Sequence, residues 1–407
     1  MKSWVTSANT ATTDFPLQNL PCGVFSDDLP PRCGVAIGDM ILDVAALEAE
    51  GILTLSDVPL FDVPFWNELM EAGPAVWADF RKRLTAMLTQ GSTKQMLLED
   101  HLIPMATATM HMPFLVSEYT DFYAGRHHAT NVGTMMRGAE NALPPNWLHM
   151  PIGYNGRASS VVVSGTDVRR PWGQVKPVDA DMPDFQPSAR FDFELELGAI
   201  VGVGSEGPIT VAQADAMIFG YVLLNDWSAR DIQAWEYQPL GPFQAKATAT
   251  TISPWIVIAA ALQPFRTTGP ARDVPLLPHL QEPGPMLYDI TLDVALNDTP
   301  IAQTNTKELY YSAAQQLTHH ASSGCPMNVG DLLGSGTISG PEKANRGSMI
   351  ELTWGGKEPL TIAGGTRTFL QDGDTVTLRG HAQGDGYRIG FGACAGRIMP
   401  ALKDWPT

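Results

Sequence analysis

The chain has 407 residues, 44% of them hydrophobic, and a formal net charge of −17. Nucleic acids and anionic membranes need a basic face, so this charge argues against both as main partners. The length supports more than one domain, and 38 glycines with 32 prolines favour turns and short strands over long helices.

The cysteines and the hydropathy pattern bear on the compartment. None of the four cysteines belongs to a CxxC pair, so we interpret them as free thiols in a reducing cytosol. Residues 1–21 have no apolar core of signal-peptide length, and no run of about 18 apolar residues occurs. We therefore expect a soluble, cytoplasmic protein without a transmembrane helix.

The first hundred residues predict a small domain of strands and one clear helix. Residues 32–44 read as a hairpin that turns at Gly38 and Asp39. From Pro74 the apolar residues follow one face of an amphipathic helix, which Gly91 ends. Residues 104–113 are a plausible link, so we expect one domain over residues 1–115 and a second over 116–407.

The second predicted domain is rich in strands. Gly, Pro and Asp separate its apolar runs, as expected for strands bounded by turns. We expect buried or alternating strands at residues 159–164, 217–224, 254–261, 290–296 and 348–354.

An acidic segment at residues 191–197 contains the pair Glu194 and Glu196. Apolar and acidic residues alternate there, which predicts a strand with two Phe and two Leu on one face and three acids on the other. Two carboxylates about 4–6 Å apart repel by about 3–4 kcal/mol in a partly buried site. Either water screens this repulsion on an exposed face, or a cation offsets it.

Two further acids could complete a cation site. Asp121 lies just before a segment that we interpret as a polar loop, and Asp226 lies at the end of an apolar run. Four carboxylates suit a hard cation such as calcium or magnesium, whereas zinc more often uses His or Cys. The residues alone do not establish that the four acids converge.

A short helix is expected directly after Asp226. Residues 228–231 match an S-x-x-D capping pattern. Arg230, Gln233 and Tyr237 then share one helical face, where they could bind a carboxylate or an oxyanion, or simply face solvent. Lys246 follows a turn that could fold it back toward them.

Histidine is the candidate general base. His128 and its neighbour His127 lie seven and six residues past Asp121, and a histidine can take a proton from water near neutral pH. Glu351 is a candidate partner for the imidazole, although strand alternation assigns it to the solvent face. Three residues could hold an anionic substrate, each equally compatible with a structural role: Tyr123, Arg137 and Tyr154.

These segments together resemble the fumarylacetoacetase family of carbon–carbon bond hydrolases. The matching strings include DFYAGRHHATNVG at 121–133, NWLHMPIGY at 146–154, NDWSARDIQ at 225–233, SGTISGPE at 335–342 and GDGYRIGFG at 384–392. Strings of this length, in this order, are specific. The resemblance implies a mainly β chain with some α structure (α+β): an N-terminal SH3-like barrel, a C-terminal mixed β-roll that carries the site, and a homodimer.

The resemblance also implies roles for single residues. It assigns calcium to Asp121, Glu194, Glu196 and Asp226, and a structural magnesium to the surroundings of Asp226, Lys246 and Thr250. It makes His128 and Glu351 the catalytic pair, with charge stabilised by Arg230, Gln233 and Lys246. It assigns substrate contacts to Tyr123, Arg137, Tyr154, Gln233, Tyr237 and Thr337. The chain departs from the family at Ala245 and Ala249, where glycine is common, and the magnesium site is the one affected.

The implied reaction is metal-dependent hydrolysis of 4-fumarylacetoacetate to fumarate and acetoacetate, the last step of tyrosine and phenylalanine breakdown. In this hypothesis His128, oriented by Glu351, activates the water. A related acylpyruvate or diketo-acid hydrolase, or a decarboxylase of the same superfamily, is the alternative. A calcium-binding structural protein without catalysis is a rival of another class.

Overall fold

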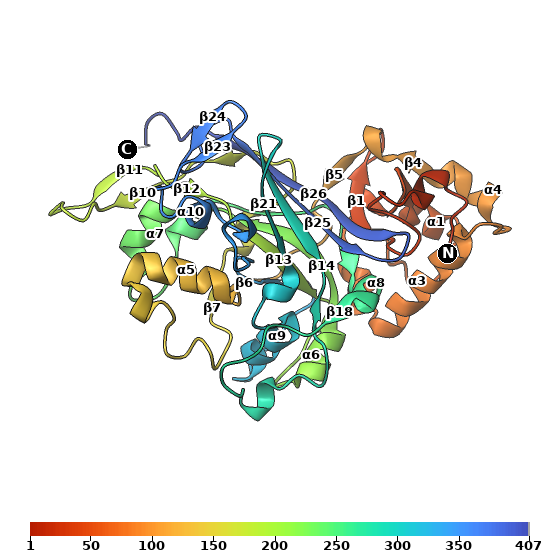
Figure 1. The fold of residues 1–407 in the computed structure, drawn as a ribbon. Helices are drawn as coiled ribbons and strands as arrows, with labels where there is room; N and C mark the ends of the chain where they lie inside the picture. The colour runs from red at the N-terminus through yellow and green to blue at the C-terminus, as the bar shows by residue number, and fades with distance from the viewer. Residues whose placement is uncertain (406–407) are drawn as a thin grey trace.

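A computed structural model describes residues 1–405 of the protein, and sheets form most of its framework (Figure 1). The N-terminal residues, drawn in red and orange, form one end of the molecule, and the rest of the chain forms the larger end. The mainly β fold with some α structure that the sequence predicts is confirmed.

The N-terminal end is built on an antiparallel sheet in the order β4-β3-β2-β1-β5. Its strands are β1 (Cys22–Ser26), β2 (Arg32–Ile37), β3 (Met40–Asp43), β4 (Leu102–Pro104) and β5 (Thr109–His111). The predicted hairpin is confirmed, since β2 and β3 pair around Gly38 and Asp39. Residues 104–113 are not a free link, because β5 within them pairs with β1.

Helices cover this sheet. The predicted helix from Pro74 is confirmed as α3 (Pro74–Leu88), which ends before Gly91 and buries Phe80, Leu84 and Leu88. The shorter helices here are α1 (Val44–Ala49), α2 (Asn67–Glu71) and α4 (Gln95–Leu98).

The larger end contains a mixed sheet in the order β7-β6-β22-β13-β14-β16-β8, with β17 also paired to β14. Only β6 with β22 and β8 with β16 run parallel in it. Its strands are β6 (Tyr119–Phe122), β7 (Gly153–Asn155), β8 (Val161–Val163), β13 (Leu195–Val201), β14 (Ile218–Asp226), β16 (Thr250–Ile252), β17 (Val257–Ile258) and β22 (Leu332–Gly334). Strand β14 is buried along its whole length, as its apolar sequence predicts.

A second sheet lies against the first, in the order β21-β20-β25-β26-β9. Its strands are β9 (Val168–Arg169), β20 (Thr291–Leu296), β21 (Thr299–Asn305), β25 (Thr375–Gln383) and β26 (Arg388–Met399). Short pairs complete the strands: β10 (Trp172–Val175) with β11 (Asp184–Pro187), β12 (Phe191–Asp192) with β15 (Ser228–Ala229), β18 (Arg266–Thr267) with β19 (Leu287–Tyr288), and β23 (Leu360–Ile362) with β24 (Gly365–Arg367).

The helices of the larger end include three that correct the sequence predictions. The supposed polar loop after Asp121 is α5 (Arg126–Arg137), and the supposed strand at 348–354 contains α10 (Met349–Leu352). The run at 254–261 is strand only in β17 and then turns into α8 (Ala259–Leu262). The others are α6 (Val211–Met217), α7 (Arg230–Glu236) and α9 (Ala313–Ala321).

The predicted capping pattern at 228–231 is also wrong. Helix α7 begins after Ala229 without a side-chain cap. The Asp231 carboxylate instead accepts hydrogen bonds from Ser188 Oγ and from the N–H groups of Ala189 and Arg190. The acid therefore ties the preceding loop to α7.

The two ends of the molecule share one buried apolar cluster. Cys22 and Ile256 exchange backbone hydrogen bonds of 2.9 and 2.7 Å. Trp77 of α3 stands edge-on to Phe219 of β14, with 5.1 Å between ring centres. The N-terminal end thus supports the strand that ends in Asp226.

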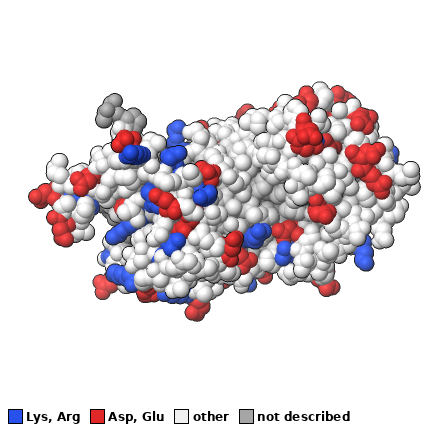
Figure 2. All heavy atoms as spheres, turned by 90° about the horizontal axis from the view of Figure 1, so that it is seen from above, with Lys and Arg blue, Asp and Glu red and all other residues white. Residues whose placement is uncertain are grey.

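The surface agrees with the net charge. On the face in Figure 2, acidic side chains outnumber basic ones over the N-terminal end, and basic side chains form no continuous stripe. None of the helices in the described part of the chain has both the length and the apolar character needed to cross a membrane.

Candidate active site

The four predicted acids converge. Asp121 is on β6, Glu196 on β13, Asp226 at the end of β14, and Glu194 directly before β13. One carboxylate oxygen from each lies within 4.8 Å of those of the others. All four side chains are buried, which excludes the interpretation of a solvated acidic face.

The sheet explains this convergence. Strands β6, β22, β13 and β14 are neighbours, so acids far apart in sequence meet across them. Gly334 of β22 pairs with Asp121 and leaves room between the acids. A Cβ at Gly334 would lie 2.7 Å from Asp121 Oδ1 and 3.0 Å from Glu196 Oε2. Only glycine keeps this space open.

The predicted strand at 191–197 is interrupted where the site needs it. Strand β12 ends at Asp192 and β13 begins at Leu195. Between them, Glu194 forms an isolated bridge with Ser348, and its backbone oxygen accepts a hydrogen bond from the N–H of Asp226 at 3.2 Å. The apolar and the acidic residues of this segment are both buried, so both of its faces are packed and neither is exposed to solvent.

Two cations offset part of the negative charge. Lys246 Nζ donates to Glu194 and, at 2.6 Å, to Asp226 Oδ2. Arg230 Nη2 lies 2.6 Å from Glu194 Oε1, and its Nε donates to Asp192 at 2.8 Å. Burial raises the pKa of Glu194, but Arg230, Lys246 and His128 together outweigh burial and lower it. Glu194 is therefore held ionised.

Asp121 and Glu196 lack such cationic partners. Asp121 Oδ1 and Glu196 Oε1 are buried without a hydrogen-bond donor. Burial, and then the neighbouring carboxylates, raise the pKa of both side chains well above the ordinary range. When all four acids are ionised, Lys246 and Arg230 offset at most two of the four negative charges, and Arg230 is shared with Asp192. Orphan oxygens and excess charge fit a hard divalent cation.

The residues of the implied second metal site also meet. Thr250 Oγ1 donates to Asp226 Oδ1 at 3.4 Å, and Lys246 contacts the other oxygen of Asp226. Ala245 and Ala249, the two departures noted in the sequence, are both buried. The two donors of the implied magnesium site, Lys246 and Thr250, are therefore already directed at Asp226.

His128 and Glu351 form a buried pair. His128 Nδ1 lies 2.6 Å from Glu351 Oε2, and Nε2 lies 3.7 Å from Glu194 Oε1. Burial raises the pKa of Glu351, but His128 and hydrogen bonds from His128, Asn131 and Ser348 outweigh burial and lower it to about 2. An ionised Glu351 accepts a hydrogen bond from Nδ1–H of His128, which leaves Nε2 free toward the cluster. Glu351 is thus buried, not solvent-facing as alternation indicates.

The adjacent His127 has a different setting. Its Nε2 lies 3.6 Å from Glu308 Oε2, and both side chains are about one third exposed (34% and 27%). Neither residue lines the cavity beside the acids. Of the two histidines, only His128 can act on a molecule bound there.

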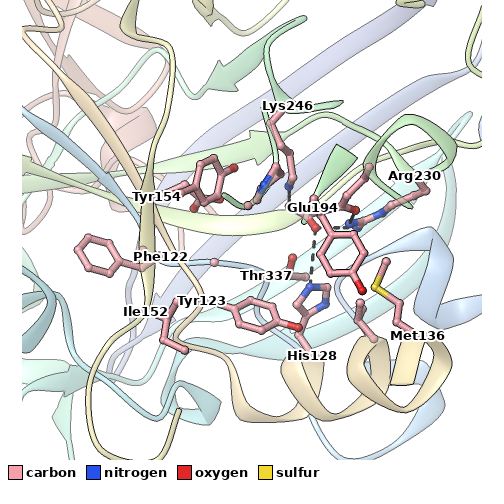
Figure 3. A pocket seen from close by; sticks show the side chains of 18 of the residues that line it. Phe122, Tyr123, His128, Met136, Ile152, Tyr154, Glu194, Arg230, Lys246 and Thr337 are labelled. Atoms are coloured by element: carbon pink, nitrogen blue, oxygen red, sulfur yellow. Dashed lines mark hydrogen bonds and ion pairs between the residues drawn. The ribbon is translucent and has the colours of Figure 1, made fainter. Parts of the chain in front are cut away.

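A cavity of about 400 Å³ opens on the cluster and the histidine (Figure 3). The predicted substrate-binding residues all line it: Tyr123, Arg137, Tyr154, Gln233, Tyr237 and Thr337. Arg230 Nη1 donates to Gln233 Oε1 at 3.1 Å, which confirms the shared face on α7. Tyr154 Oη donates to Asp226 at 3.1 Å, and Thr337 Oγ1 is buried without a partner.

Sequence reasoning missed the apolar lining and the support of Glu351. The cavity also contains Phe122, Val132, Met136, Ile152, Leu240 and Pro242. Glu351 accepts further hydrogen bonds from Asn131 at 2.8 Å, Ser339 at 2.9 Å and Ser348 at 2.7 Å. Asn131 stands three residues after His128 on one helix, a spacing that could have revealed it.

Two family models match most of the chain. Residues 118–399 match the model of the fumarylacetoacetate (FAA) hydrolase C-terminal family, and residues 18–113 match that of the fumarylacetoacetase N-terminal family. The geometry and these matches define a hydrolase of this class. The chain belongs to the fumarylacetoacetate hydrolase family.

Relatives are similar along nearly the whole chain. A fumarylacetoacetase of Homo sapiens is 50% identical over 96% of this chain and 97% of its own length. One of Arabidopsis thaliana is 47% identical over 95% of this chain and 96% of its own length. The solved fumarylacetoacetate hydrolase from psychrophilic Exiguobacterium antarcticum is 16% identical, with a TM-score of 0.54, over 94% of this chain and 99% of that chain; this likeness concerns the fold.

Proposed function

We infer that the protein is a fumarylacetoacetase, which hydrolyses a carbon–carbon bond of 4-fumarylacetoacetate to give fumarate and acetoacetate. The observation that carries this function is one cavity that opens on a buried four-carboxylate cluster and on His128, which is paired with Glu351. Identity of about half the residues to fumarylacetoacetases from several organisms supports the substrate. The enzyme belongs to the tyrosine and phenylalanine breakdown route.

We propose that the cluster holds calcium through its four acids: Asp121, Glu194, Glu196 and Asp226. The unpartnered oxygens of Asp121 and Glu196 support this assignment. A structural magnesium near Asp226, Lys246 and Thr250 is the second metal that we propose. Held by these residues, a divalent cation would neutralise the carboxylates and would supply Lewis-acid polarisation of the substrate's keto groups.

The chain's own residues then divide the work. His128 Nε2 takes a proton from water while Glu351 holds Nδ1 and stabilises the imidazolium. The hydroxide adds to the carbonyl carbon of the fumaryl group. Arg230, Gln233 and Lys246 donate hydrogen bonds to the oxyanion that forms. When the C–C bond breaks, the acetoacetate carbon takes up the proton.

The remaining lining residues bind the substrate. Fumarylacetoacetate has a carboxylate at each end, and we propose that Arg137 meets one of them with help from Tyr123. Arg137 is held by the carbonyl groups of Asn141 and Ala142, at 3.1 and 2.7 Å, so its guanidinium is already oriented. Tyr154, Tyr237 and Thr337 offer hydroxyls along the rest of the cavity.

The test is a spectrophotometric assay of fumarylacetoacetate loss with and without a chelator. We expect turnover to disappear on chelation and to return when calcium or magnesium is added. An acylpyruvate, assayed in parallel, should be a much poorer substrate. Faster hydrolysis of the acylpyruvate would contradict the assignment, and turnover that survives complete chelation would contradict the metal site.

We also propose how the chain is organised. The division into residues 1–115 and 116–407 is supported by the separate N-terminal sheet. Four unpaired cysteines, three of them buried, support a reducing cytoplasm. A homodimer follows from the family resemblance, and light scattering on the purified protein measures it directly.

A further inference from the structure

Asp192 is a buried carboxylate without a part in the roles proposed above. It ends β12, is shielded from solvent, and is the first of the three acids in the alternating segment 191–197. Its two oxygens accept four hydrogen bonds from protein donors. It does not line the cavity, so it has no contact with substrate.

The two oxygens of Asp192 connect different elements. Oδ1 accepts from the N–H groups of Phe193 and Met349 at 2.8 and 2.7 Å. Oδ2 accepts from Arg230 Nε at 2.8 Å and from the Ile350 N–H at 3.1 Å. The carboxylate thereby ties α7 to the first turn of α10, and both helices lie near β12 in Figure 1.

Both elements that Asp192 holds reach the site. From α7, Arg230 extends Nη2 to within 2.6 Å of Glu194. From α10, Glu351 lies 2.6 Å from His128. One side chain therefore stands behind both the carboxylate cluster and the catalytic pair.

We propose that Asp192 is a positioning residue that fixes Arg230 and α10 relative to each other, so that Glu194 and the His128–Glu351 pair keep the geometry that hydrolysis needs. This role rests on the proposed function. A displacement of about 1 Å at a reacting group can lower turnover about 100-fold. Asp192 can thus control the rate without contacting the substrate.

The test begins with Asp192→Asn. Asparagine can keep the acceptor at Oδ1, but its amide nitrogen would then face two donors, Arg230 Nε and the Ile350 N–H. We expect kcat for fumarylacetoacetate to fall roughly 10- to 100-fold. We expect KM to change by less than about threefold, because Asp192 makes no hydrogen bond to Arg137 or Tyr123, which we propose to bind the substrate carboxylate.

Asp374 provides a matched control. It is also buried and accepts two hydrogen bonds of 2.9 Å from Arg367, but it does not line the cavity. Asp374→Asn removes a buried aspartate–arginine pair in the same way. We expect it to lower thermal stability while kcat stays within about twofold of wild type.

Double variants test whether Asp192 acts through its neighbours. If it does, D192N lowers kcat less in an R230Q or E351Q background than in the wild-type protein. If D192N lowers kcat by the same factor in both backgrounds as in the wild-type protein, the proposal is overturned. Wild-type kcat in D192N, or an equal loss of kcat in D374N, would overturn it as well.

Two further comparisons complete the design. If D192N does not fold, Asp192→Glu replaces it, since glutamate keeps the charge but moves the oxygens by one methylene. A positioning role requires a lowered kcat in D192E, and wild-type turnover there refutes it. If R230Q and E351Q themselves keep full turnover, the proposed catalytic roles fail, which is distinguishable from a failure at Asp192 alone.

Discussion

The pairing of Glu351 with His128 allows one prediction to be worked through in numbers. Glu351→Gln keeps the size and one acceptor oxygen but removes the negative charge beside the imidazole. The pKa of Glu351 falls from its ordinary value of 4.5 to about 2 in the folded protein. At about 1.4 kcal/mol per pH unit, its ionised form is stabilised by about 3 kcal/mol.

The same interaction sets the expected loss of activity. If the carboxylate stabilises the imidazolium in the transition state by a similar amount, its removal lowers kcat about 100-fold. The assay is steady-state loss of fumarylacetoacetate, with folding of the variant verified by circular dichroism. KM should change little, because Glu351 does not line the cavity.

Stability gives an independent measurement of the same energy. Because the folded pKa of Glu351 is lowered, its contribution is fully present above pH 4.5 and is lost as the pH falls toward about 2. The difference in unfolding free energy between wild type and E351Q should therefore be about 3 kcal/mol near neutral pH. It should shrink steadily below pH 4.5.

Glu308→Gln is the matched control. Glu308 pairs with His127 at 3.6 Å on the surface, where the exchange should change neither turnover nor stability by much. The reasoning about Glu351 is refuted if E351Q keeps more than about a third of the wild-type kcat. It is also refuted if E308Q loses as much activity as E351Q.

Three further predictions concern the cluster and the base. His128→Ala should lower turnover at least about 100-fold with cation binding retained, whereas His127→Ala should stay near wild type; the assay is fumarylacetoacetate loss. Gly334→Ala should weaken calcium binding at least about tenfold by calorimetry, because the new Cβ would lie 2.7 Å from Asp121 Oδ1; Gly207→Ala, with open space around it, is the control. The raised pKa values of the Asp121 and Glu196 carboxyls mean that the folded chain holds protons more tightly than the unfolded chain. Stability of the chelated protein should therefore fall as pH rises from acidic to neutral, and calcium should abolish that fall; thermal melts across pH, with and without calcium, measure both.

Patterns with a regular period predicted the fold well. The hairpin at Gly38, the helix from Pro74 and the strands β14 and β20 all follow from local apolar spacing and turn residues. The face shared by Arg230 and Gln233 on α7 follows from helical spacing in the same way. In each case the local pattern and the packing favour the same structure.

The strand prediction for the segment around Glu351 was wrong for a physical reason. The run at 348–354 alternates like a strand, but a single turn of helix is too short for its period to be distinguished by sequence. Tertiary contacts decide the outcome. Asp192 accepts hydrogen bonds from the N–H groups of Met349 and Ile350, and Ser339 and Asn131 donate to the Glu351 carboxylate. None of these partners is close to Glu351 in sequence. Only the resemblance to a family indicated the role of Glu351.

Convergence of the acids likewise could not be derived from spacing. Asp121 and Glu196 are separated by β22, which comes more than 130 residues later in the chain and lies between their strands. The sheet order is a property of the whole fold, and the two-residue spacing of Glu194 and Glu196 carries no information about it. Resemblance supplied the four acids as a set, and the sheet explains why they meet.

A comparison of two kinds of buried acid supports a functional role for the cluster. Asp374 has donors for both oxygens, from Arg367, Asn297 and the Gln371 N–H, and these hydrogen bonds lower its pKa despite burial. Asp121 and Glu196 are equally buried, but each leaves an oxygen without a donor, and the pKa of each is raised. An acid that serves only the fold is stabilised by the fold, as Asp374 is. Burial of Asp121 and Glu196 opposes their ionisation, and this destabilises the chain. A cation that binds all four carboxylates would reverse that penalty.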